Sequence, residues 1–167
     1  LTKSGEVYRN VNSKTKLAQV YEIPIVVHVL SKGDPLGTEN NPNDQQVIDW
    51  IDYTNKVFDG TGDKMANETN GGTVIPVKFV LAKIDPKGKP TNGIDRIDLS
   101  NNESFVKYGI NSSSSSNGLL DSQVVKEYGW ESTKYYNIYV AHRSAVGSAA
   151  TNGYANYPGP DQNSDKS

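Results

Sequence analysis

Cysteine is absent from this chain of 167 residues, and histidine occurs only twice, as His28 and His142. The lack of cysteine excludes disulfides, thiolate metal sites and a cysteine nucleophile. Two histidines are too few for a zinc site built from three imidazole ligands. Counting alone therefore removes much of the catalytic chemistry that a chain of this length could carry.

The chain also lacks long apolar runs and an excess of charge of one sign. Its 17 basic and 19 acidic residues are interspersed and leave a net charge of -2, so we expect no nucleic acid and no membrane as partner. No stretch approaches the roughly 18 apolar residues of a membrane helix, and the first residues form no apolar signal-peptide core. The length fits one domain.

A surface rich in Asn, Ser, Thr and Tyr is typical of exported proteins, which predicts a secreted, extracellular or periplasmic location.

Three apolar segments predict strands, at residues 23–30, 74–82 and 135–141. The first is a nearly continuous β-branched run, which is typical of a central strand covered on both faces. Between the first two, apolar side chains recur every three to four residues over 44–58, which predicts a helix capped by Asn43 or Asp44. Strand, helix and strand in this order form a βαβ unit, so the sequence predicts an α/β fold with an at least partly parallel sheet.

Two shorter helices are expected, over residues 101–108 and 122–128, with Phe105 and Val106 of the first one buried. The segment between the second and third strands, around residues 85–93, is rich in glycine and proline and is expected to form turns.

Few side chains suggest chemistry on their own. His28 lies inside the first strand, where we predict a core histidine with a backbone partner rather than a ligand or a catalyst. His142 follows the third strand, and a catalytic role for it is the weaker interpretation. The carboxylates between Asp85 and Asp95 lie in a glycine-rich turn but lack the alternating ligands of a calcium loop.

Five segments carry a family pattern. Residues 23–30 read IPIVVHVL, close to IPVVVHVI, and residues 45–58 fit a helix with the pattern Q-I-x-x-x-I-x-x-x-N-x-x-F. Residues 85–96 read DPKGKPTNGIDR, close to DPxGxPTxGIxR, and residues 130–140 read WESTKYYNIYV, close to WDTDKYLNIYV. Residues 153–159 read GYANYPG, close to GYAQFPG. This succession resembles the pappalysin-type metalloproteases, a branch of the metzincins that includes the ulilysin-like enzymes.

The resemblance implies a metzincin-like twisted mixed sheet with a backing helix and an active-site helix. It also implies a zinc-dependent endopeptidase whose zinc is held by H-E-x-x-H-x-x-G-x-x-H, with the glutamate as general base. No His-Glu pair occurs in this chain, so we expect the zinc helix to lie beyond it and the chain alone to be inactive, without catalytic or metal-binding residues. We expect an N-terminal arm at 1–20, the N-terminal part of the catalytic domain at 21–160 and a flexible tail at 161–167. Some relatives carry calcium, which leaves calcium open as a second metal.

Three explanations of the missing motif stay open: a nicked protease whose second chain carries zinc, a truncated protease, or a non-catalytic module. In the first two, the resemblance places a substrate-binding edge for a protein or peptide substrate at Gly153, Tyr154, Ala155, Asn156 and Tyr157. In the third, a secreted module would bind protein or glycan through a surface of tyrosines. These tyrosines are Tyr135, Tyr136, Tyr139, Tyr154 and Tyr157.

Overall fold

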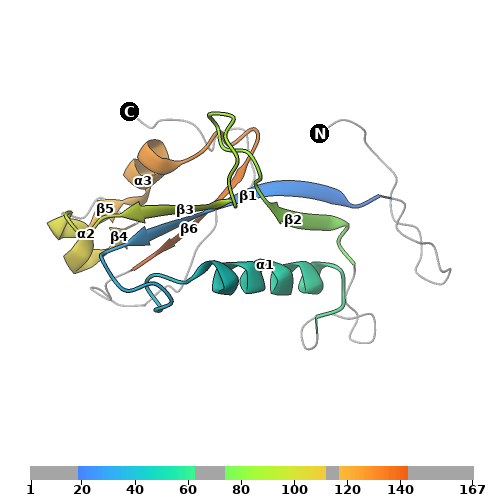
Figure 1. Cartoon of the computed structure of the whole chain (residues 1–167), viewed down its shortest axis with the longest axis horizontal. Helices are drawn as coiled ribbons and strands as arrows, with labels where there is room; N and C mark the ends of the chain where they lie inside the picture. Colours follow the sequence, from blue (N-terminus) through green and yellow to red (C-terminus); the bar gives the residue numbers. More distant parts are fainter. Residues whose placement is uncertain (1–18, 63–73, 112–116, 143–167) are drawn as a thin grey trace.

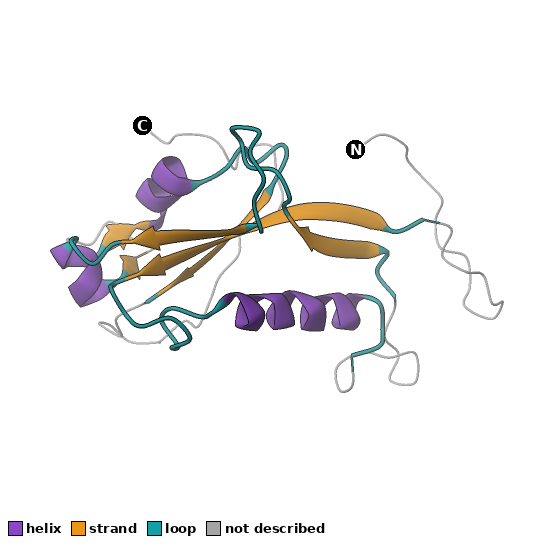
Figure 2. Cartoon of the chain, in the orientation of Figure 1, coloured by secondary structure: helices purple, strands orange, loops and turns teal. Residues whose placement is uncertain are grey.

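The computed structural model describes residues 19–62, 74–111 and 117–142, and its helices and strands are shown in Figures 1 and 2. The elements follow one another as β1 (Tyr21–Ser31), α1 (Asp44–Phe58), β2 (Val77–Leu81), β3 (Ile94–Asp98), α2 (Glu103–Tyr108), β4 (Ile110–Asn111), β5 (Leu119–Leu120), α3 (Asp121–Tyr128) and β6 (Tyr136–Ala141).

The central strand of the main sheet is β1, which pairs in parallel with β2, β3 and β6. At Ile25, β1 pairs with Leu81 of β2 on one side and with Tyr136 of β6 on the other. At His28, it pairs with Asp95 of β3 and again with β6. Because β6 pairs with one side of β1 both opposite β2 and opposite β3, β2 and β3 must lie end to end along the other side. The predicted α/β class, the central position of this strand and the parallel pairing are confirmed.

The central strand is longer than predicted, because it begins at Tyr21 and ends at Ser31. Pro24 lies within it although proline has no N–H to donate. The N–H groups of Tyr21 and Val27 bond on the β2 and β3 side, so by alternation Pro24 faces the other side. There β6 begins only opposite Ile25, so the ladder loses nothing at Pro24.

The helix α1 begins and ends at the predicted residues, and its start is fixed by a cap. The side chain of Asn43 accepts from the N–H of Gln46, and the side chain of Gln46 accepts in return from the N–H of Asn43. The apolar side of α1 packs on one face of the sheet, where Val47 joins Ile25 and Val27 in a buried cluster. Figure 1 shows α1 running beneath the sheet along β1 and β2.

The opposite face of the sheet carries a second buried cluster, to which the short helices contribute. Leu30 of β1 packs there with Phe105 of α2 and Val124 of α3. The prediction that both Phe105 and Val106 are buried is half wrong, because Phe105 is fully buried and Val106 is 37% exposed. Neighbouring residues of a helix point about 100° apart, so one short helix packed on one surface buries only one of them.

The strand β3 was not predicted, and the predicted strand over 74–82 is shorter, since β2 begins at Val77. The chain leaves the sheet after Ala82 and returns at Ile94 to pair with the continuation of β1. Gly93 closes this excursion with a φ of +76°, and a Cβ atom there would lie 2.7 Å from the backbone nitrogen of Ala82. Only glycine fits this close approach.

Among the described residues, no helix is long and apolar enough to cross a membrane.

Candidate functional site

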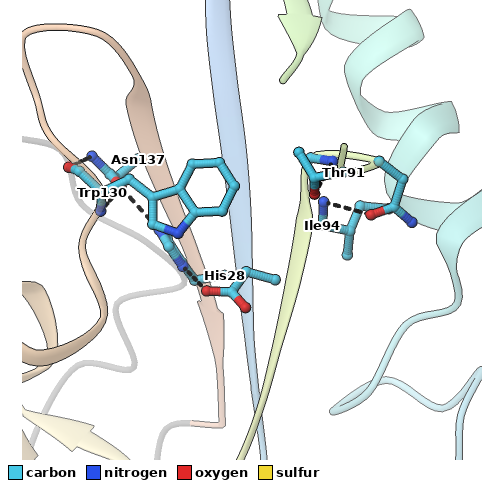
Figure 3. A network of polar contacts seen from close by, with 8 residues as sticks. His28, Thr91, Ile94, Trp130 and Asn137 are labelled. Atoms are coloured by element: carbon cyan, nitrogen blue, oxygen red, sulfur yellow. Dashed lines mark hydrogen bonds and ion pairs between the residues drawn. The ribbon is translucent and has the colours of Figure 1, made fainter. Parts of the chain in front are cut away.

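A buried histidine lies at the centre of the sheet and is tied to both neighbouring strands. The ring of His28 is fully buried. Its Nδ1 lies 3.1 Å from Oδ2 of Asp95 in β3, and its Nε2 lies 2.9 Å from Oδ1 of Asn137 in β6 (Figure 3). The predicted core position is confirmed, but the predicted backbone partner is wrong. Strand pairing places Asp95 directly opposite His28, so both partners are side chains from adjacent strands.

Asn137 also closes the turn that leads into β6. Its Oδ1 accepts from the N–H of Trp130 at 2.8 Å, and its Nδ2 donates to the carbonyl oxygen of Trp130 at 3.0 Å. The ring of Tyr139 stacks on His28 with centroids 4.8 Å apart, and Trp130 meets His28 edge-on at 6.1 Å. Segments distant in sequence therefore converge on one imidazole.

The turn-rich excursion between β2 and β3 is held by its own hydrogen bonds. Oδ1 of Asp85 accepts from the N–H groups of Lys87 and Lys89. Near its end, Oγ1 of Thr91 accepts from the N–H of Gly93. Figure 3 shows Thr91 across β1 from Trp130 and Asn137. Asp85 accepts hydrogen bonds from backbone N–H groups, whereas Asp95 contacts the ring of His28. The two carboxylates therefore bind different groups and do not come together as calcium ligands.

His142 lies just past β6, at the end where the parallel strands β1 and β6 both finish. Partial burial lowers the pKa of its imidazole, the positive charge of Lys32 lowers it further, and Asp34 opposes both effects. Its carbonyl oxygen accepts from the N–H of Ile110 at 3.2 Å. The geometry shows a strand end joined to β4, and the charged groups that act on the ring are Lys32 and Asp34.

The described residues contain no group of three His, Cys, Asp or Glu side chains that could hold a metal ion. The predicted substrate-binding residues lie outside the described part of the chain. These are Gly153, Tyr154, Ala155, Asn156 and Tyr157.

The described tyrosines do not form the single surface expected of a binding module. Tyr136 is 51% exposed. Tyr139 stacks on the buried His28. Tyr135 donates its hydroxyl to the carbonyl oxygen of Ile84 at 2.9 Å and so anchors the excursion. These positions have structural reasons and do not require a ligand.

Residues 118–167 match the peptidase family model described as pregnancy-associated plasma protein-A. Together with the parallel sheet and its backing helix, this match defines the class: the chain has the fold of a metzincin protease, and the predicted resemblance to the pappalysin type is confirmed. No curated protein matches the chain significantly.

Among solved structures, the chain is similar to mature mirolysin of Tannerella forsythia in complex with a cleaved peptide. The two share 25% identity over 73% of this chain and 42% of that one, with a TM-score of 0.50. A promirolysin mutant from the same organism is 25% identical over 73% of this chain and 37% of its own, with a TM-score of 0.49. The chain thus spans less than half the length of these relatives.

Proposed function

We propose that residues 21–160 form the N-terminal part of the catalytic domain of a secreted zinc-dependent metalloendopeptidase. In this proposal the zinc-binding helix lies beyond this chain or on a second chain. The observation that carries the proposal is the match of residues 118–167 to a peptidase family model. The similarity of the sheet to that of mature mirolysin supports it.

The zinc ligands come from other residues in this proposal. The sequence has two histidines, and both ring nitrogens of His28 already have side-chain partners. The described residues therefore do not fit a zinc site, and the role of this chain is structural and substrate-binding. Calcium, if the complete protein holds it, is not held by Asp85 and Asp95 together.

The proposed contribution to catalysis is the alignment of a substrate. Residues Gly153 to Tyr157 would pair with the backbone of an extended peptide, so that main-chain groups supply affinity and adjacent pockets select side chains. The similar mirolysin structure holds a cleaved peptide, which supports a protein or peptide as the substrate class.

The first test is native mass spectrometry of the product of the complete reading frame, with a zinc count and a denatured intact mass. We expect one zinc per complex and cleavage of an unfolded protein substrate that a chelator abolishes and added zinc restores. A zinc-free species that unfolds cooperatively and cleaves nothing would contradict the proposal and favour the non-catalytic module.

The substrate edge is tested separately in that active protein. We expect Tyr154→Ala to raise KM for a peptide substrate with a smaller change in kcat, because the residue would bind substrate away from the reacting atoms. Tyr53→Ala is the matched control, since Tyr53 is 49% exposed on α1. Equal kinetics for the two variants would remove residues 153–157 from the proposed site.

A further inference from the structure

We propose that His28 is a pH-dependent side-chain link between strands of the central sheet, called the pin below. With a proton on each ring nitrogen, it ties β1 to β3 through Asp95 and to β6 through Asn137, and loss of one proton breaks one of these ties. This inference concerns the fold of the described residues and does not depend on proteolytic activity.

The orientation of the Asn137 amide is the first step. Its Oδ1 faces the N–H of Trp130 and its Nδ2 faces the carbonyl oxygen of Trp130 and, at 3.4 Å, that of Tyr135. A flipped amide would set its N–H₂ group against the N–H of Trp130 and lose both carbonyl acceptors. The atom facing Nε2 of His28 at 2.9 Å is therefore an acceptor.

The other ring nitrogen also faces an acceptor. Nδ1 of His28 lies 3.1 Å from a carboxylate oxygen of Asp95, whose side chain is 36% exposed and thus keeps contact with water. A neutral imidazole has only one N–H and can donate to only one of two acceptors. With the Asp95 side chain as a carboxylate, only the imidazolium satisfies both contacts, and it forms a charge-assisted hydrogen bond with that carboxylate.

Among the described residues, no group that contacts the ring carries a positive charge. Among the described residues, the ionisable groups that contact it are Asp95 of β3 and Tyr139 of β6. Burial raises the pKa of Tyr139 to about 12, so its ring stays neutral at physiological pH. The π face of Tyr139 stacks on the imidazole with planes 17° apart, an arrangement that attracts a positive charge. The contacts from the segment before β6, Trp130 and Asn137, are uncharged.

Deprotonation has a defined structural consequence. The proton passes to water or buffer, most directly along the partly exposed Asp95, and one ring nitrogen keeps a lone pair. That lone pair then faces either the Asp95 carboxylate or Oδ1 of Asn137, and the latter cannot turn away without breaking its bonds to Trp130. Two acceptors in contact repel, so β1 loses its side-chain tie to β3 or to β6.

An Asp95→Asn variant tests the pin, because acidification should change its stability in the direction opposite to that of the native chain. An amide at position 95 can donate to a neutral Nδ1 while Nε2–H still donates to Asn137, so the variant completes the network with an uncharged ring. The native network is complete only with a proton on each ring nitrogen, whereas the variant network is complete with a neutral ring. Acidification over roughly pH 8 to 5, where histidine titrates, therefore favours the native chain and disfavours the variant.

The measurement is urea unfolding of the 167-residue chain, followed by tryptophan fluorescence across that pH range. We expect the ratio of the unfolding constants of D95N and native protein to rise by about tenfold or more on acidification, as for one charged hydrogen bond. Asp52→Asn is the control, because it makes the same charge change at an exposed position of α1. Equal pH dependence of D95N and D52N would overturn the proposal.

A direct readout on the unsubstituted chain keeps the proposal testable if D95N fails to fold. Nitrogen-15 NMR of the His28 ring should show a proton on both ring nitrogens at the acidic end of the range, with slow exchange of both with water. A ring that carries a single proton throughout would show a neutral core histidine and refute the pin.

Discussion

Asn55 of α1 protects the outer edge of β2, and its removal should destabilise the domain. Its Nδ2 donates to the carbonyl oxygen of Phe79 at 2.9 Å, and its Oδ1 accepts from the N–H of Phe79 at 2.8 Å. One amide thus satisfies both outward backbone groups of a strand residue, as a neighbouring strand would. These contacts are partly buried beside Ile51 and Leu81, and an Asn55→Ala variant would leave both backbone groups of Phe79 without their side-chain partner.

The expected cost follows from the two hydrogen bonds. Each contributes about 1 kcal/mol, and a partly buried N–H or C=O that loses its partner adds up to about 1 kcal/mol more, so the free energy of unfolding should fall by about 2 to 4 kcal/mol. This is a large share of the roughly 5 to 15 kcal/mol that stabilises a typical domain.

The assay for Asn55→Ala is urea unfolding followed by far-UV circular dichroism. Gln45→Ala is the control on the same helix, because Gln45 is exposed and its side chain donates to the neighbouring Asp49. It should change stability by less than about 0.5 kcal/mol. An Asn55→Asp variant should not restore stability, since its carboxylate can accept from Phe79 but cannot donate to it. A loss below about 0.5 kcal/mol for Asn55→Ala would refute the edge-protection argument.

Three further predictions rest on single contacts. Gly93→Ala should cost about 2 kcal/mol or more in urea unfolding, because it strains a positive φ and drives Cβ into the backbone of Ala82; a neutral result would contradict the close approach. Phe105→Ala should cost about 3 to 5 kcal/mol by the same assay, since the ring is fully buried; a cost below about 1 kcal/mol would show a poorly packed site. Burial raises the pKa of Tyr139 from 10.0 to about 12, so the unfolded chain ionises first and stability should fall as pH rises from 10 towards 12. Tyr139→Phe should lose this alkaline sensitivity at little cost near neutral pH, because the hydroxyl has no partner among the described residues; an unchanged alkaline transition would be the contrary outcome.

The parts of the fold that were predictable are those with local causes. The β-branched run over 23–30 predicts a strand covered on both faces, whatever its neighbours are. The reciprocal cap at Asn43 and Gln46 sets the start of α1 without any distant contact. The parallel pairing followed from the order of strand, helix and strand. None of these inferences required a contact between residues far apart in the chain.

The strand β3 could not be predicted because its cause is distant. Its sequence, Ile94 to Asp98, has five residues of which three are charged, and it follows a turn-rich excursion. It is a strand because β2 ends and leaves the rest of one side of β1 open for pairing. The two-residue strands β4 and β5 are strands only because they pair with each other.

The candidate site shows the same division. Burial of His28 was predictable from its strand, but its partners lie 67 and 109 residues away and are fixed by strand register. Part of a signal was present, because Asn137 is a matched residue of the segment 130–140 that resembles the family, whereas Asp95 falls at an unspecified position of the segment 85–96. The expected substrate edge at 153–157 had no such local or register-based support and rested on the resemblance alone.

Within the described residues, the segments that resemble the family mainly build architecture. Residues 85–96 contain the Asp85 turn, the close approach at Gly93 and the Asp95 contact to His28. Residues 130–140 contain the Trp130 and Asn137 bonds that close the turn before β6. The contacts of these residues within the fold are enough to explain why they are there. Their similarity to a protease therefore supports the fold strongly and the activity only indirectly. Cleavage chemistry therefore has to be tested by its own activity assay, and the sheet can be tested by the stability of this chain.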